Sequence, residues 1–191
     1  RSIVAAGTLS VKWAVTHPGT HYASGPDMEA SLRKNVEYYT PHVELALKNN
    51  VGIALENEFE YKKRPFQRIF ASTMPELCAL ADAFAAPNVG VCYDFGHGNL
   101  TGGFHRRNLN IIGHRLKAVH VADNLGEQDS HFMPFFGNVD WADAMAGLAD
   151  IDYQGDLTYE IQEFPRYLPN ELKYVAVEMS IPIGNHLIGL Y

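Results

Sequence analysis

The sequence predicts an α/β fold, namely a parallel (β/α) barrel of which this chain carries five strand–helix units. Five short apolar runs start near residues 11, 51, 89, 116 and 156, at intervals of 27 to 40 residues. This spacing is typical of a repeated strand–helix unit. The runs are almost continuously apolar, as strands are when both faces of a parallel sheet are buried. Each run is followed by a segment with helical character, which completes the pattern of the unit.

The predicted strands end at one face of the barrel, because parallel strands all point the same way. A closed barrel has eight strands and takes about 250 residues. The 191-residue chain is therefore expected to be a single partial domain over residues 1–191, equivalent to the C-terminal five of eight units. We expect the biological chain to be longer, or a partner to cover the open edges. The predicted strands are 11–16, 51–55, 89–93, 116–119 and 157–159.

Helix-start signals mark the segments between the strands. Asp27 and Asp140 precede apolar periodic segments and are expected to cap helices at their N-termini. Thr73 and Glu76 form a capping-box pattern. Pro41 is expected to kink or divide the helix that contains it. The predicted helices are 3–9, 28–48, 73–84, 141–148 and 169–179, and the Gly-, Asn- and His-rich segments 98–110 and 124–138 are expected to be loops.

Composition narrows the class of protein. Fifteen Lys and Arg against 22 Asp and Glu give a net charge of −7, which attracts neither nucleic acid nor anionic membranes. The basic clusters 62–64 and 106–107 are too short for a nucleic-acid track, and no apolar stretch approaches the ~18 residues of a membrane span. Cys78 and Cys92 are expected as free thiols of a cytoplasmic protein. A homo-oligomer is compatible with this composition.

Each predicted strand runs into a residue able to bind a metal, and the five are His17, Glu56, Asp94, His120 and Glu160. A glutamate at the end of a central strand is costly to bury unless it is paired or metal-bound, so a salt bridge is the alternative role for Glu56. Three carboxylates and one imidazole, from Glu56, Asp94, His120 and Glu160, make a hard, mostly oxygen site. Such a site suits one Mn²⁺, Mg²⁺ or Co²⁺ ion, with Zn²⁺ also compatible.

Further polar residues follow these strand ends. His97 stands three residues after Asp94, where it could contact the substrate of the same ion or a second ion. Asp129 and His131 form a D-x-H pair in the loop after His120. His17 could bind a metal, hold a substrate oxygen or pack locally as a loop histidine. We expect no functional role for three other residues. Glu58 and Glu60 should be exposed to solvent, and Trp141 should pack in the core.

The ordered motifs HPG, IALEN, VCYDFGH, HVADN…DSH…GNVDW and LTYEI resemble the xylose-isomerase-like TIM barrel superfamily of sugar-phosphate isomerases and epimerases, from about Ile3 to Met179. The resemblance implies a TIM-type barrel with one divalent metal on Glu56, Asp94, His120 and Glu160. It also implies that Glu56 and Glu160 act as an acid/base pair at a carbon next to a carbonyl. The expected substrate is a sugar, sugar phosphate or inositol-derived ketone, and the residues expected to bind it are His17, His97, Asp129 and His131.

The chain departs from the ketose 3-epimerases of that superfamily at three places. They carry an Arg six residues after the metal histidine and a Glu six residues after the first ligand, where this chain has Gly126 and Lys62. Their Pro-Gly-x-Gly segment is here 134–137, Pro-Phe-Phe-Gly, which should narrow or reshape the pocket. The D-x-H loop is closer to inosose-dehydratase-like members, so a lyase activity stays open.

Two other functions remain open. The superfamily includes trinuclear zinc endonucleases that act at abasic DNA sites, and their ligand pattern also matches the chain at eight positions. The net charge and the acidic segment 58–60 argue against a DNA substrate, because both would repel a phosphate backbone. A barrel that has lost catalysis and only binds a ligand is the other alternative, which the complete four-ligand set argues against. The eight matching residues are His17, Glu56, Asp94, His97, His120, Asp129, His131 and Glu160.

Overall fold

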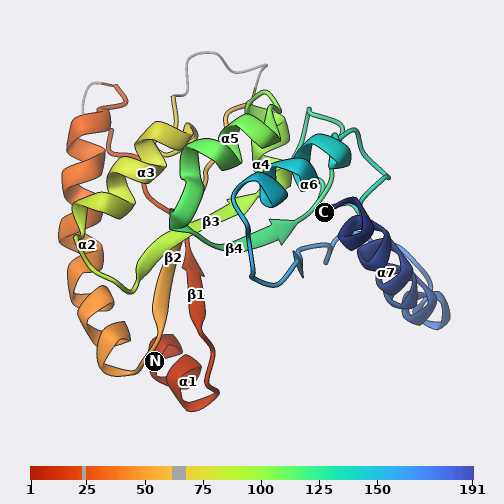
Figure 1. Ribbon diagram of the computed structural model, residues 1–191, viewed down its shortest axis with the longest axis horizontal. Coiled ribbons are helices and arrows are strands. Elements are labelled where there is room, and N and C mark those ends of the chain that lie inside the picture. The colour runs from red at the N-terminus through yellow and green to blue at the C-terminus, as the bar shows by residue number, and fades with distance from the viewer. Residues whose placement is uncertain (23–24, 62–67) are drawn as a thin grey trace.

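The computed structural model describes residues 1–22, 25–61 and 68–191, and it contains one parallel sheet (Figure 1). The strands lie in the order β1-β2-β3-β4-β5, and every neighbouring pair is parallel. The sheet curls, so that β1 approaches β4 although two strands separate them in the sheet. The predicted fold class is confirmed as a parallel partial barrel. The strands are β1 (Trp13–Thr16), β2 (Gly52–Glu56), β3 (Val89–Asp94), β4 (Leu116–Val121) and β5 (Thr158–Tyr159).

Helices connect the strands and pack beside the sheet, as Figure 1 shows, and α7 extends from the edge of the molecule beyond β5. Among the described residues, no helix is long and apolar enough to cross a membrane. The departures at Lys62 and in the basic cluster 62–64 lie outside the described residues. The helices are α1 (Ser2–Thr8), α2 (Met28–Lys48), α3 (Met74–Ala83), α4 (Phe95–Thr101), α5 (His105–Ile112), α6 (Trp141–Asp150) and α7 (Asn170–Leu190).

Two of the predicted helix caps are present. The Asp27 carboxylate accepts from the backbone N–H of Ala30 at 2.9 Å and starts α2. The Asp140 carboxylate starts α6 in the same way, through the N–H of residue 143 at 3.0 Å. Pro41 lies inside α2 without dividing it. The helix α2 leads into β2 and α6 leads into β5, and these two strands end at Glu56 and Glu160.

The capping box predicted for α3 is not formed. The Thr73 hydroxyl makes no capping hydrogen bond. Glu76 instead accepts from the guanidinium of Arg68 at 2.5 Å and from the N–H of Ala71 at 3.2 Å. Glu76 therefore does not bond to the backbone of Thr73 as in a capping box. Its contacts with Arg68 and Ala71 hold the end of the connection between β2 and α3.

The predicted loop 98–110 is wrong, because α4 and α5 occupy most of it. The Asp94 carboxylate caps α4 by accepting from the N–H of His97 at 2.6 Å. In α5, Leu109 and Ile112 are fully buried, so burial of an apolar face outweighs the weak helix propensity of a Gly- and Asn-rich segment. The last helix is also longer than predicted, since α7 continues to Leu190 instead of ending near residue 179.

Large side chains lie over glycines on the sheet face that also carries Glu56. A Cβ atom at Gly52 would stand 2.2 Å from the ring of Trp13, and one at Gly90 would stand 2.2 Å from Cγ of Lys117. The two glycines therefore make room for a tryptophan from β1 and a lysine from β4. The Lys117 ammonium lies 6.0 Å from the centroid of the Trp13 ring, within the range of a cation–π contact.

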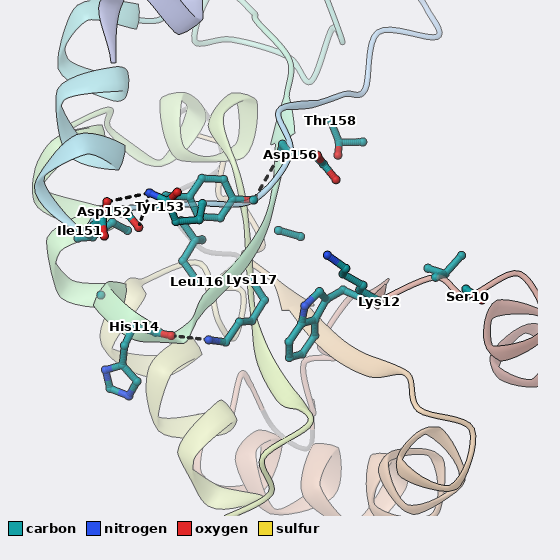
Figure 2. Close-up of a pocket in the computed structure, with 16 residues that line it drawn as sticks. Ser10, Lys12, His114, Leu116, Lys117, Ile151, Asp152, Tyr153, Asp156 and Thr158 are labelled. Atoms are coloured by element: carbon teal, nitrogen blue, oxygen red, sulfur yellow. Dashed lines mark hydrogen bonds between the residues drawn. The ribbon is translucent and has the colours of Figure 1, made fainter.

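A hollow of about 730 Å³ opens at the N-terminal ends of the strands (Figure 2). Trp13, Lys117 and Thr158 line it from the sheet, and Tyr153 lines it from the loop before β5. Glu56, Asp94, His120 and Glu160 do not line it. Functional residues of parallel barrels lie at the C-terminal strand ends, so this hollow is separate from the candidate site.

Candidate functional site

Four side chains from four consecutive strands converge at the C-terminal end of the sheet. Glu56 ends β2, Asp94 ends β3, His120 lies near the end of β4, and Glu160 directly follows β5. Asp94 and His120 are partners in the strand register. Each of the four offers one ligand atom, and these atoms all lie within 4.8 Å of one another. The fold thus brings together the four residues that the sequence singled out as metal ligands.

His120 lies between the two glutamates. Its Nδ1 atom is 2.9 Å from Oε1 of Glu56 and 2.9 Å from Oε2 of Glu160. Although burial opposes the charge, these hydrogen bonds raise the pKa of His120 to about 10. Burial also opposes ionisation of Glu56, yet hydrogen bonds with His120 and His17 lower its pKa to about 2. Without an ion, a proton on the imidazole balances the carboxylates, and a divalent cation could replace it.

Asp94 carries the strongest signal for a bound cation. Its carboxylate is fully buried, and burial raises its pKa to about 6. Oδ1 accepts from the backbone N–H of His97, whereas Oδ2 is buried with no hydrogen-bond partner among the described residues. A buried carboxylate oxygen without a donor is costly unless a cation neutralises it. Together with two further carboxylates and an imidazole, this donor set fits Mn²⁺, Mg²⁺, Co²⁺ or Zn²⁺.

Asn57 joins the ends of β2 and β3, a role that the sequence did not reveal. The buried amide oxygen accepts from the N–H of Asp94 at 2.7 Å, and the amide nitrogen donates to the Asp94 carbonyl at 3.2 Å. The Asn57 carbonyl accepts from Nδ1 of His97 at 2.7 Å. Asn57 therefore fixes both the strand end that carries Asp94 and the orientation of the His97 ring.

A second group, formed by His97, Asp129 and His131, lies beside the first. Nε2 of His131 is 2.9 Å from Oδ2 of Asp129, and Nε2 of His97 is 3.4 Å from the same oxygen. Nδ1 of His131 donates to the Glu160 carbonyl at 3.0 Å. The hydrogen bond with Asp129 raises the pKa of His131 to about 9. Burial opposes the charge on His97, but nearby Asp94 and Asp129 raise its pKa to about 10.

His17 faces the first group from the loop after β1. Its Nε2 atom is 3.2 Å from Oε2 of Glu56, and this hydrogen bond raises the pKa of His17. The ring centroid lies 6.1 Å from that of His97. About half of the His17 side chain is exposed. Of its three predicted roles, local packing alone is the least compatible with this position, because the ring points at a buried carboxylate.

The segment after Glu56 contributes more than the sequence indicated. Glu58 and Glu60 were expected to be exposed, but both are partly buried. Burial raises the pKa of Glu58, and Glu60 accepts from Arg68 at 2.5 Å. The ring of Phe59 lies 4.6 Å from that of His97. An alternating polar–aromatic pattern past a strand end was the only signal for this arrangement, and it does not distinguish a site wall from a solvated loop.

Comparison with known proteins identifies one matching family and two related proteins. Residues 1–177 match the family described as a xylose isomerase-like TIM barrel. The uncharacterized protein y4fM of Sinorhizobium fredii (strain NBRC 101917 / NGR234) is 31% identical over 128 residues, which cover 67% of this chain and 39% of that protein. The uncharacterized protein MJ1311 of Methanocaldococcus jannaschii is 27% identical over 167 residues, or 83% of this chain and 54% of that protein. The chain thus spans roughly half the length of these relatives or less.

Solved structures share the fold. A crystal structure of a D-tagatose 3-epimerase-like protein superposes with a TM-score of 0.74 and 23% identity, covering 98% of this chain and 68% of that one. A D-psicose 3-epimerase determined in the presence of D-fructose superposes with a TM-score of 0.78 and 14% identity, with the same coverage of both chains. At these identities the likeness establishes the architecture.

Proposed function

Since the chain belongs to the xylose isomerase-like TIM barrel family, we propose that it performs the chemistry of a divalent-metal-dependent isomerase or epimerase. The substrate would be a sugar, a sugar phosphate or an inositol-derived ketone. The observation that carries the proposal is the cluster of Glu56, Asp94, His120 and Glu160, in which a buried Asp94 oxygen has no partner among the described residues. The sugar epimerases among the solved structures of this fold support the same class of reaction.

Glu56, Asp94, His120 and Glu160 would hold one divalent ion, with Mn²⁺, Mg²⁺ or Co²⁺ favoured by the three carboxylates and Zn²⁺ also compatible. When bound, the ion would supply Lewis acidity for a substrate carbonyl and the negative charge that develops on it. The remaining steps fall to the side chains of the chain itself.

Glu56 and Glu160 are the proposed acid/base pair. They come from β2 and from the end of β5, and both contact the same atom, Nδ1 of His120. Hydrogen bonding to His120 lowers the pKa of both carboxyls, so both can accept a proton at neutral pH. One would remove the proton from the carbon next to the carbonyl. The other, after taking a proton from solvent, would deliver it to the opposite face of the same carbon, which gives epimerisation. Return of the removed proton by the first group to the adjacent carbon gives isomerisation, and such groups contribute about 10²–10⁴-fold in rate.

The histidines and the loop aspartate would hold the substrate. His97 and His131 donate from Nδ1 to backbone carbonyls, which leaves their Nε2 atoms directed at Asp129 and the space beside it. His17 would contribute from the loop after β1, next to Glu56. Imidazoles and a carboxylate suit the hydroxyl groups of a carbohydrate, because they offer both donors and acceptors.

The proposal is tested by incubating the protein with Mn²⁺ and a panel of ketoses, aldoses, sugar phosphates and inosose in D₂O. We expect metal-dependent deuterium incorporation at a carbon next to the carbonyl of one substrate. Glu160→Gln and Glu56→Gln should each abolish it. Glu163→Gln is the matched control, because Glu163 is close in sequence but pairs with Arg166 at the surface. Wild-type exchange in both Glu56→Gln and Glu160→Gln would disprove the assignment of the acid/base pair.

In the same panel, loss of water from inosose would identify a lyase of the dehydratase type. No metal uptake and no exchange with any compound would favour a barrel that only binds a ligand. The thiols of Cys78 and Cys92 are free and buried, which supports the proposed cytoplasmic location.

A metal-dependent phosphodiesterase is the second candidate, and one observation favours it. His97 and His131 direct two nitrogens at Asp129, whose Oδ1 atom is buried without a partner among the described residues. These three residues could hold zinc beyond the first site. The net charge of −7 and the acidic residues after Glu56 act against a nucleic-acid substrate. Three bound zinc ions and cleavage of an oligonucleotide with an abasic site would make this the preferred function.

A further inference from the structure

The loop between β4 and α6 is folded around the carboxylate of Asp123, which is fully buried. Oδ1 accepts from the N–H of Asn124 at 2.8 Å and from that of Val139 at 3.0 Å. Oδ2 accepts from the N–H of Phe135 at 2.9 Å and from Nε1 of Trp141 at 3.0 Å. Three of these four donors are 12 to 18 residues away in the chain. One side chain therefore fixes the beginning and the returning half of the same loop.

The backbone of this loop reinforces the arrangement. Asp123 and Phe132 exchange two backbone hydrogen bonds, at 2.9 and 2.8 Å, as an isolated antiparallel bridge. Gly137 passes so close to the carboxylate that a Cβ atom there would stand 2.2 Å from Oδ1 of Asp123. Asp129 and His131 lie in the part of the loop between these fixed points. Their positions consequently depend on how tightly the two halves are held.

Asn124 connects the same loop to the neighbouring strand end. Its amide nitrogen donates to the carbonyl of Gly96 at 2.8 Å, at the start of α4 between Asp94 and His97. Its amide oxygen accepts from the N–H of Gly126 at 2.9 Å. The loop is thus tied on one side to the first group of the site, while Asp123 closes it on itself.

We propose that Asp123 is the positioning residue of the candidate site. Its carboxylate holds the returning half of the loop, and thereby keeps His131 against the Glu160 carbonyl and Asp129 facing His97. The donors to the Asp123 carboxylate belong to the loop and to Trp141, and none belongs to a proposed metal ligand. The inference rests on the proposed function only in giving Asp129 and His131 a role in substrate binding.

The chemistry of the carboxylate supports positioning over simple packing. A buried carboxylate is expensive to desolvate, and an apolar residue would fill the same space at lower cost. Only a carboxylate offers two oxygens that each accept two hydrogen bonds from donors in fixed directions. An asparagine at position 123 would keep one such oxygen and turn two of the donors toward an N–H₂ group.

The test compares Asp123→Asn with the wild type by two readouts that need no catalytic activity. Proton NMR follows the imidazole Nδ1–H signals of His131 and His97, which bond to the carbonyls of Glu160 and Asn57. Hydrogen–deuterium exchange follows peptides across the chain. Asp140→Asn is the matched control, because it makes the same chemical change in the same loop but affects only the cap of α6.

In Asp123→Asn we expect the His131 signal to disappear and the His97 signal to persist. Hydrogen–deuterium exchange over residues 125–139 should become at least about tenfold faster, while the strands of the sheet keep wild-type rates. Unchanged loop exchange with a protected His131 signal would overturn the proposal. So would loss of both signals together with faster exchange across the whole sheet, because Asp123 would then be a general stability residue.

Trp141→Phe is the second variant and removes one donor to Asp123 while keeping an aromatic side chain. Faster exchange confined to residues 125–139 supports the proposal even if Asp123→Asn does not fold, and unchanged or global exchange overturns it. The two readouts do not depend on turnover. If the protein catalysed no deuterium incorporation into any sugar, the proposed function would be refuted. The NMR and hydrogen–deuterium exchange results would still decide the role of Asp123.

Discussion

Replacing Asp94 with asparagine should stabilise the ion-free protein. Burial raises the pKa of Asp94 from 3.8 to about 6. A shift of about two units corresponds to about 3 kcal/mol, at roughly 1.4 kcal/mol per unit. Because the folded-state pKa is the higher one, ionised Asp94 destabilises the fold fully above about pH 6 and not at all below its unfolded pKa. Asparagine keeps an oxygen for the N–H of His97 and carries no charge.

The gain should be smaller than the full value, because the new amide donors also need partners. We expect about 1–3 kcal/mol at pH 7.5, and a rise in Tm of about 2–4 °C per kcal/mol. The same substitution should weaken the response to metal. A ligand present at 100 times its Kd stabilises a protein by about 2.7 kcal/mol. The wild type should show a shift of this size with Mn²⁺, and Asp94→Asn, with a Kd at least about tenfold higher, should show about half of it or less.

The assay is urea unfolding of chelator-treated protein at pH 4 and pH 7.5, with and without Mn²⁺. The difference between wild type and Asp94→Asn should shrink to about 0.5 kcal/mol or less at pH 4, where the carboxyl is protonated in the folded state and partly protonated in the unfolded state. Asp82→Asn is the control: Asp82 is a surface partner of Arg115, so its loss should change stability by about 1 kcal/mol or less in either condition. Two results would refute the reasoning. One is destabilisation of ion-free Asp94→Asn by several kcal/mol, and the other is a response of Asp94→Asn to Mn²⁺ as large as that of the wild type.

Two further predictions concern packing in the fold away from the proposed metal ligands. Burial lowers the pKa of His105 to about 4. The free energy of unfolding should therefore be highest above about pH 6.5, where this histidine is neutral in both states. It should fall by up to about 3 kcal/mol as pH falls toward 4. His105→Gln should flatten the measured free energy of unfolding over this range, and an unchanged slope would contradict the assignment. Gly52→Ala should cost about 1–3 kcal/mol in urea unfolding, because the new Cβ meets the Trp13 ring. Gly189→Ala, with open space around it, should cause no loss, and equal effects would contradict the account of the inner face.

Much of the fold could be predicted from the sequence because parallel strands leave a strong local signal. Apolar runs of four to six residues gave β1 to β4, and a ligand-type residue at each strand end gave Glu56, Asp94 and His120. Even the two-residue strand β5 was found, since Glu160 closes an apolar run. The convergence of these residues follows from strand direction alone.

The errors have a common physical cause. Segment 98–110 has the composition of a loop, but burial of Leu109 and capping by Asp94 make it helical. Thr73 matched a capping pattern, whereas Arg68 takes the glutamate that would complete it. Local patterns do not show which tertiary partner competes for a side chain.

The positioning residues were missed for a related reason. Asn57 binds backbone groups 37 to 40 residues away, and Asp123 binds donors up to 18 residues away. Neither spacing has a helical or strand period, so no periodic pattern reveals it. Such residues become visible only when the backbone groups around a buried polar side chain are known.

The central claim is that strand-end side chains hold one divalent ion, and metal titration of chelator-treated protein tests it most directly. Wild-type protein should bind about one equivalent of Mn²⁺ per chain, and Asp94→Asn should bind it at least about tenfold more weakly. Elemental analysis of protein purified without chelator should agree with that stoichiometry. Less than about a tenth of an equivalent, with no uptake of added Mn²⁺, Mg²⁺, Co²⁺ or Zn²⁺, would contradict the account.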